Sequence, residues 1–321
     1  MAPEPVRGEG PRPPGAGLLL GATLALFLVW SNTFLAFEVL LAPRAGEAPL
    51  RWVELVLARF LPVAAIAGGW LLLFRRREAL ALARERPLRL LAGALCAVPA
   101  YNALLYDGMQ HRVEGPVASV LTSLVPLYLL VLGAAFLGER LGARKVAGFL
   151  LGLGGVVLIA TAREGGGASR ALRVAEVAAA PLCWSIYSAL TRPVARDGSP
   201  LVWTFLVLAV GGVLVLPLAP FADPARLASL DAGDAALVAY LVLAATVFGN
   251  GVWSWLLRHL PASTVGLTVF LNPPLTLASK TLLSLLLPAT FAVAIAPREW
   301  IGGALALLGV GLAVVRPRGG G

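Results

Sequence analysis

Three charged side chains lie inside long apolar stretches of the sequence: Glu38, Arg59 and Lys280. Placing one such charge inside a membrane costs at least ~2.5 kcal/mol on insertion scales, so a charge at that depth needs a partner or a function. Depths counted from the ends of the stretches put all three in the same outer part of the bundle. We therefore expect Glu38 to pair with Arg59 or with Lys280. The alternative is that each long side chain extends to the membrane surface.

A second set of polar and aromatic side chains falls near the middle of the apolar stretches, when 1.5 Å of helix rise is counted for each residue. Asn, Ser and Tyr supply hydrogen bonds, and Trp offers a flat apolar surface or a cation-π partner. The alternative is that these residues only join helices, at ~1 kcal/mol or less each. The candidates for lining a binding site are Trp30, Ser31, Asn32, Asn102, Trp184, Tyr187, Asn250 and Asn272.

Three prolines also fall near mid-depth. Pro126 lies in the fourth apolar stretch, and Pro273 and Pro274 lie in the ninth. Each removes a backbone donor, so we expect both helices to be kinked or broken there. Carbonyl groups freed at such a break are tolerated in a membrane only when they are buried in protein or face a watery space.

The composition shows what must position these residues. Of 321 residues, 59% are hydrophobic and 13% charged, compared with roughly a quarter charged in soluble domains. A membrane-crossing helix needs ~20 mostly apolar residues. Their length and continuity favour helices over the short alternating strands of a membrane barrel, and predict an all-α integral membrane protein with ten transmembrane helices. The stretches are 18–41, 52–74, 88–106, 117–137, 146–162, 174–191, 201–221, 235–257, 264–287 and 300–315.

The formal charge of +9 is distributed unevenly between the predicted loops. With the N-terminus in the cytoplasm, sixteen Lys and Arg fall on the inner side and eight on the outer side, which favours both termini inside. We expect the membrane to be a bacterial inner membrane. No basic stripe is interleaved with aromatic residues, so we expect no nucleic-acid partner. Arg75, Arg76 and Arg77 form a basic run that we interpret first as a determinant of topology and second as a site for anionic membrane lipids. Cys96 and Cys183 fall inside helices without metal-ligand spacing, so neither a metal nor another cofactor is expected.

The last five stretches repeat the first five. Adding 154 takes Trp30 to Trp184 and Gly148 to Gly302, and adding 148 takes Asn102 to Asn250. Because each copy has an odd number of helices, the second enters the membrane from the opposite side. Two inverted five-helix repeats are typical of alternating-access transporters. We expect a cytoplasmic tail at 1–17, repeats at 18–162 and 174–315, a connecting loop at 163–173 and a second cytoplasmic tail at 316–321, the first tail being disordered because it is rich in Pro and Gly.

In this order the motifs resemble the drug/metabolite transporter superfamily, specifically its ten-helix members with two EamA domains. The resemblance covers about 18–315. Two departures are present: the second copy lacks the Gly-Glu-Arg-Leu motif and instead runs into an extra apolar segment at 288–297, and Glu38 stands where the family has a Lys in the first helix. The motifs are Trp30-Ser31-Asn32, Ala58-Arg59-Phe60, Pro126 followed by Gly138-Glu139-Arg140-Leu141, and the glycine-rich 148–158 and 302–312.

The resemblance implies a secondary transporter that moves a small molecule by alternating access, in the direction of export, for amino acids, related metabolites or amphipathic drugs. In such a protein the charges at Glu38, Arg59 and Lys280 would serve as an outer gate or, if Glu38 titrates, couple transport to protons or another ion. A carrier of nucleotide sugars or polyprenyl lipids is the nearest alternative. A membrane-embedded enzyme is less favoured, because no nucleophile with a base lies at membrane depth. The residues identify neither the substrate nor the oligomeric state.

Overall fold

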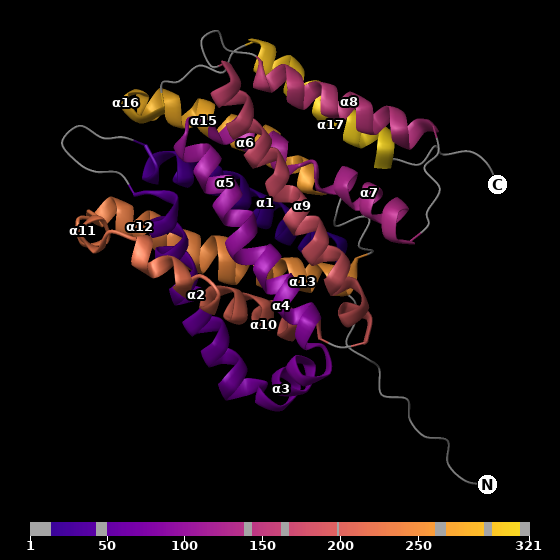
Figure 1. Ribbon diagram of the computed structural model, residues 1–321, viewed down its shortest axis with the longest axis vertical. Coiled ribbons are helices and arrows are strands. Elements are labelled where there is room, and N and C mark those ends of the chain that lie inside the picture. Colours follow the sequence, from indigo (N-terminus) through magenta and orange to yellow (C-terminus); the bar gives the residue numbers. More distant parts are fainter. Residues whose placement is uncertain are drawn as a thin grey trace.

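The structure, a computed structural model, describes residues 14–42, 50–137, 143–161, 167–197, 199–260, 268–291 and 297–314. Every regular element in these ranges is a helix (Figure 1). The Gly-Glu-Arg-Leu motif at 138–141 and the C-terminal tail lie outside the described residues, as do most of the N-terminal tail and parts of the connecting loop and the extra apolar segment.

Within the described residues, seven helical stretches are long and apolar enough to cross a membrane. Two shorter apolar ones, Gly115–Leu129 and Val146–Ile159, and α17 (Pro297–Val314) supply the remaining three of the ten expected. The predicted all-α membrane fold is confirmed. The seven are α1 (Ala16–Leu40), α2 (Trp52–Phe74), α4 to α5 (Pro87–Gln110), Ala168–Thr191 within α9 (Gly167–Asp197), α10 with η2 (Pro200–Phe221), Ala232–Leu256 and Val269–Leu286.

Several of these stretches change helix type along their length. Pro99 lies in a π-helical turn, η1 (Cys96–Ala100), between α4 (Pro87–Leu95) and α5 (Tyr101–Gln110). The second half has a π-helical segment at the matching place, η3 (Leu241–Phe248), between α12 (Ala232–Tyr240) and α13 (Gly249–His259). Wide turns of this kind are often found at functional sites.

The prolines of the fourth and ninth helices lie where those helices are interrupted. α6 (Gly115–Thr122) ends just before α7 (Val125–Leu137), whose second residue is Pro126. Pro273 and Pro274 occupy the first turn of α15 (Asn272–Leu286), directly after the short 3-10 helix η4 (Val269–Leu271). Proline is tolerated at a helix start because the donor it lacks would be unpaired there anyway.

The two halves pack through matching helices. α2 packs on α10, α6 packs on α15, and α8 (Ala143–Ala160) packs on α17, which are the counterparts of one another in the repeat. α1 of the first half contacts η3 and α13, while α9 of the second half contacts η1 and α5. The third membrane-crossing helix of each half therefore packs against the first helix of the other half. This arrangement is expected when two related halves exchange their first helices.

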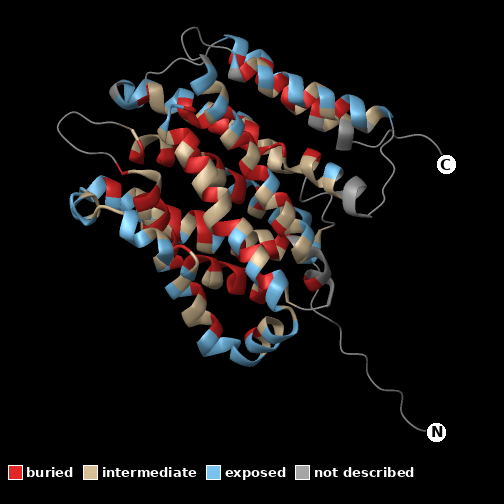
Figure 2. Ribbon diagram, viewed as in Figure 1, coloured by how far each residue is buried: buried red, intermediate tan, exposed pale blue. Residues whose placement is uncertain are grey.

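α8 and α17 run side by side at one edge of the molecule, although they are far apart in the sequence (Figure 1). Their backbones touch at glycines: a Cβ on Gly155 would lie 2.5 Å from the Gly302 carbonyl oxygen, and one on Gly309 would lie 2.4 Å from the Gly152 nitrogen. Small residues allow this close approach of membrane helices. Exposed residues lie on the outside of the pair, whereas buried residues gather among the central helices (Figure 2).

The remaining short helices lie outside the spans. α3 (Arg76–Glu85) follows α2, α11 (Pro224–Ala228) follows η2 (Leu216–Phe221), and α16 (Pro288–Phe291) follows α15. α10 itself covers Pro200–Val213.

Candidate functional site

Glu38 and Lys280 form an ion pair between the two halves. The Lys280 Nζ lies 2.6 Å from Glu38 Oε1, and the backbone N–H of Gly115 donates to Glu38 Oε2 at 3.1 Å. The Lys280 side chain is 4% exposed and that of Glu38 20%. The pair thus joins α1 of one half to α15 of the other, with the start of α6 as a third contact. Of the two partners expected for Glu38, the structure uses Lys280.

Arg59 takes no part in that pair. Its Nε donates to Thr246 Oγ1 at 2.9 Å, and its Nη1 donates to the hydroxyl of Tyr106. The guanidinium carbon lies 5.4 Å from the centroid of the Phe37 ring and 4.9 Å from that of Phe60. Arg59 is therefore held by hydroxyls and aromatic rings, and no described carboxylate lies within ion-pair distance of it.

The two repeat-related tryptophans have different surroundings. Trp30 donates from Nε1 to the carbonyl of Ala245 at 2.9 Å, and its ring centroid lies 5.4 Å from that of Trp253. A Cβ on Gly249 would lie 2.4 Å from Trp30 Nε1, so this glycine makes room for the indole. The repeat places Tyr101 in the first half where Gly249 stands in the second.

Trp184 consequently meets a tyrosine where Trp30 meets a glycine. Its ring centroid lies 5.6 Å from that of Tyr101 and 5.2 Å from that of Tyr187. Trp184 and Tyr101 are half-buried, and Tyr187 is buried. These three rings form a continuous aromatic surface along α5 and α9, which we call the aromatic row.

The amide nitrogens of three predicted site residues are used within their own helices. Asn102 donates to Val98, and Asn250 donates to Thr246, each to a carbonyl oxygen at 2.8 Å. Asn32 donates in the same way to Leu28 at 2.8 Å. Because the Asn102 and Asn250 bonds reach back into η1 and η3, these residues satisfy carbonyls at the two π-helical turns.

Ser31 and Asn272 lie where α1 meets α15. Ser31 is fully buried and donates from Oγ to the Leu28 carbonyl at 3.1 Å, while its own carbonyl accepts from Thr276 Oγ1 at 3.1 Å. Asn272, one turn before Thr276, is 7% exposed, and its Oδ1 has no hydrogen-bond partner among the described residues. An unpaired buried acceptor costs about 1–3 kcal/mol. The Oδ1 of Asn272 is thus an acceptor that lacks a hydrogen-bond donor among the described residues.

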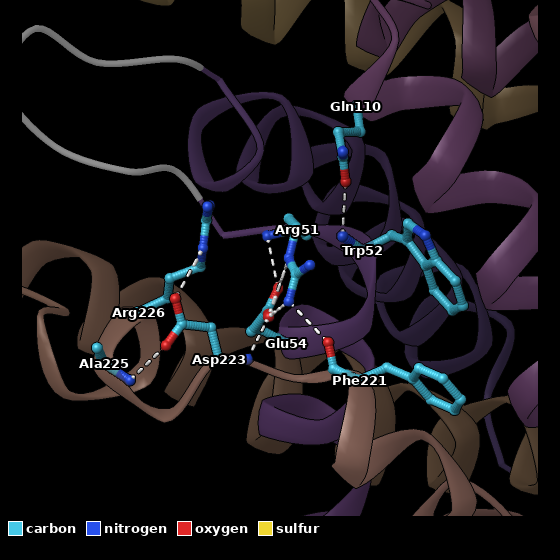
Figure 3. Close-up of polar contacts among 8 residues, drawn as sticks. All are labelled: Arg51, Trp52, Glu54, Gln110, Phe221, Asp223, Ala225 and Arg226. Atoms are coloured by element: carbon cyan, nitrogen blue, oxygen red, sulfur yellow. Dashed lines mark hydrogen bonds and ion pairs between the residues drawn. The ribbon is translucent and has the colours of Figure 1, made fainter.

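Glu54 is a buried charge that reasoning from the sequence overlooked. It is fully buried in the first turn of α2, and its carboxylate accepts from the backbone N–H groups of Arg51 (2.9 Å) and Asp223 (2.8 Å). Arg51 donates to Glu54 and to the carbonyl of Phe221 at 2.7 Å (Figure 3). The bond to Glu54 raises the pKa of Arg51, which therefore stays charged. Applied to 52–74, the rule used for Glu38 would have found Glu54.

A further cluster ties the same end of the bundle. Arg173 at the start of α9 pairs with Asp107 near the end of α5, and Arg170 pairs with Glu299 at the start of α17. Arg170 also lies 3.8 Å from Glu114. Among the described residues, three ion pairs join the first half to α9 or α15, and all three lie at the end where α1 and α5 finish: Glu38–Lys280, Asp107–Arg173 and Glu114–Arg170. We call this the Glu38 end.

Two five-helix halves that exchange their first helices, with interrupted helices and paired charges between them, define the class of membrane transporters built from inverted repeats. A comparison with known families then places the chain: the model of the EamA-like transporter family matches residues 16–161 and again 174–315. The chain belongs to the EamA-like transporter family and is an integral membrane protein.

Individual relatives agree with this assignment. A probable terminal-alkyne amino-acid exporter of Streptantibioticus cattleyicolor is 30% identical over 90% of this chain and 91% of its own length. A probable amino-acid metabolite efflux pump of Escherichia coli is 27% identical over 61% of this chain and 69% of its own. An aromatic amino acid exporter of Ancylobacter novellus is 42% identical over 27% of this chain and 32% of its own. One crystal structure with 23% identity covers 93% of this chain and 97% of its own, and its TM-score of 0.56 shows a shared fold.

Proposed function

We propose that the protein exports a small amino-acid-like metabolite across the bacterial inner membrane by alternating access, with both termini in the cytoplasm. The observation that carries this proposal is the Glu38–Lys280 ion pair, which holds the two halves together at one end of the bundle. The related amino-acid exporters named above support the substrate class. The sequence contains no G-x-x-x-x-G-K-[ST] motif for ATP binding, so on this proposal an ion gradient drives the cycle.

On this proposal the halves are residues 18–162 and 174–315, and the substrate sits between them beside Trp30, Trp184 and Tyr187. The unpaired Oδ1 of Asn272 supports a donor on the substrate, such as an amino group. Asn102 and Asn250 would act through the π-helical turns, since their amide nitrogens are already bonded.

The Glu38–Lys280 pair is proposed as the gate at the outer face. Opening that end separates α1 from α15, and the pair must break for this to happen. Protonation of Glu38 removes one charge of the pair, so a proton taken up from outside would favour opening. Export against a concentration gradient would then be coupled to proton entry.

The test is transport by the purified full chain in proteoliposomes, across a panel of amino acids and related metabolites, with and without a pH gradient. We expect saturable flux of at least one amino acid that rises with the gradient. Lys280→Ala should abolish the dependence on the gradient, and Arg77→Gln on the exposed face of α3 should leave it unchanged. Flux that depends equally on pH in Lys280→Ala would remove the gating role. If the protein transported only phosphorylated or lipid-linked compounds, the proposed amino-acid substrate class would be wrong and the alternative carrier function would take its place.

The orientation has its own test. In a background without Cys96 and Cys183, the replacements Arg77→Cys and Arg316→Cys should both react with a membrane-impermeant thiol reagent only from the cytoplasmic side. Reaction of the two from opposite sides would contradict the inverted-repeat topology with both ends inside.

A further inference from the structure

Arg59 is a cation enclosed by helices from both halves. Phe37 of α1, Phe60 of α2, Tyr106 of α5 and Thr246 of η3 all contact its guanidinium group. A side chain in contact with three other helices points into the bundle and not toward lipid. Because Arg59 is nevertheless only half-buried, part of its side chain remains open to a small molecule.

The positive charge of Arg59 has no counter-ion among the described residues. Its two recorded hydrogen bonds go to hydroxyl groups, which carry no charge. Glu38, which follows Phe37 in α1, is bonded to Lys280 and Gly115. A guanidinium group has five donors in a planar fork, so three remain after the recorded bonds. A charge held in an apolar bundle without an anion is costly, which points to an anion that arrives from outside the chain.

We propose that Arg59 binds the carboxylate of the transported molecule, an inference that rests on the proposed function and names its substrate class. A carboxylate is planar and accepts two parallel bonds from a guanidinium fork, a match that ammonium groups do not offer. Thr246 and Tyr106 hold the fork in place from two sides. The site therefore selects carboxylic acids and repels lipophilic cations.

The aromatic row indicates the rest of the substrate. Tyr101 lies on α5, as does Tyr106, which is bonded to Arg59. The ring of Tyr101 touches that of Trp184, which in turn touches Tyr187. An aromatic or branched apolar group lying along these rings would keep its carboxylate within reach of Arg59. The predicted substrate is thus an acid with an apolar or aromatic side chain, such as an apolar amino acid.

Matched probes test this directly: labelled phenylalanine and leucine against their amides, which keep the side chain and lack the carboxylate. Counterflow is measured in proteoliposomes containing the full chain, and tetraphenylphosphonium serves as the cationic probe. The wild type should carry each acid at least tenfold better than its amide and should not carry the cation. Arg59→Gln should lower the acid-to-amide ratio at least tenfold, and Arg77→Gln should leave the ratio unchanged.

The ratio within each variant separates binding from folding. Tyr106→Phe removes a bond to Arg59 but no charge, so it should keep the preference for acids even if the total rate falls. Arg59→Lys keeps the positive charge but lacks the planar guanidinium group, so it should lower the acid-to-amide ratio several-fold. If Arg59→Gln does not fold, the ratio in Arg59→Lys tests the role of Arg59.

Each outcome bears on a different claim. Equal transport of acid and amide by the wild type, or an unchanged ratio in the Arg59 variants, would overturn the role of Arg59 while transport of amino acids stands. Transport of tetraphenylphosphonium with neither acid, or no transport of any probe, would overturn the amino-acid substrate class and this inference together.

Discussion

Removing the two charges of the Glu38–Lys280 pair one at a time should destabilise the fold unequally. Two unit charges 2.6 Å apart attract by about 6 kcal/mol at an effective dielectric constant of about 20, and much of this is offset by the cost of removing both charges from water. Glu38→Gln leaves the Lys280 ammonium, 4% exposed, without a carboxylate. Lys280→Met leaves the Glu38 carboxylate without an ammonium partner. This carboxylate is 20% exposed in the native protein and keeps its hydrogen bond from the N–H of Gly115.

We therefore expect Glu38→Gln to cost about 3 kcal/mol and Lys280→Met about 1–2 kcal/mol, since a stranded charge costs most where it is least exposed. The double variant strands no charge, so its cost should be about 2–3 kcal/mol smaller than the sum of the two single costs.

The assay is thermal unfolding of the purified protein in detergent, followed by the reaction of a thiol dye with the chain's two cysteines. Cys96 lies in the first half and Cys183 in the second, and both are half-buried, so unfolding of either half exposes a thiol. At about 2 °C for each kcal/mol, the single variants should differ by several degrees. Arg77→Met, which removes an exposed cation from α3, serves as the control with no expected shift. A double variant whose cost equals the sum would show that the two charges do not stabilise each other, and equal costs for the single variants would contradict the argument from exposure.

The same measurement tests three other contacts. Gly309→Leu should cost about 2–3 kcal/mol because its Cβ would meet the facing backbone at 2.4 Å, whereas Gly311→Leu, with nothing within 4 Å, should be neutral; equal effects would contradict the close packing of α8 and α17. Glu54→Gln should cost about 3 kcal/mol by leaving its buried donors poorly paired, and Glu78→Gln, whose partner is 4.0 Å away and exposed, should cost nothing measurable. Trp30→Phe should cost about 1 kcal/mol through the loss of its indole hydrogen bond, and an unchanged midpoint would show that this bond contributes no net stability.

The fold was largely predictable because length and apolar character are local properties of a sequence. The stretch 52–74 coincides with α2, and the interruptions near Pro126 and Pro273 follow from the missing backbone donors. Neither π-helical segment was predicted: η3 contains no proline, and η1 contains Pro99, at which no break was expected from the sequence. η3 packs against α1 and α2, contacts that only the tertiary structure shows.

The site was predictable in its residue types and less so in its pairings. Depth in the membrane places Glu38, Arg59 and Lys280 at one level, but it does not say which helices face one another. The structure assigns Lys280 to Glu38 and surrounds Arg59 with hydroxyls and rings because α1 lies against α15 on one side and α2 lies against η3 on another. Asparagine amides that bond their own helix could not be distinguished by sequence from amides that face a ligand.

The repeat also shows that the two ends of the proposed pathway are chemically different. The offsets that relate the halves place Arg192 opposite Glu38 and Leu132 opposite Lys280, so the duplicated positions carry no matching pair of charges. In an alternating-access cycle built from exchanged halves, two like ends would give two conformations of similar energy. On the proposed function, the Glu38–Lys280 pair would instead stabilise the conformation closed at the Glu38 end, and breaking this pair would shift the balance toward opening there. On this proposal the duplication would supply the two conformations, and residues present in only one copy would supply the bias between them.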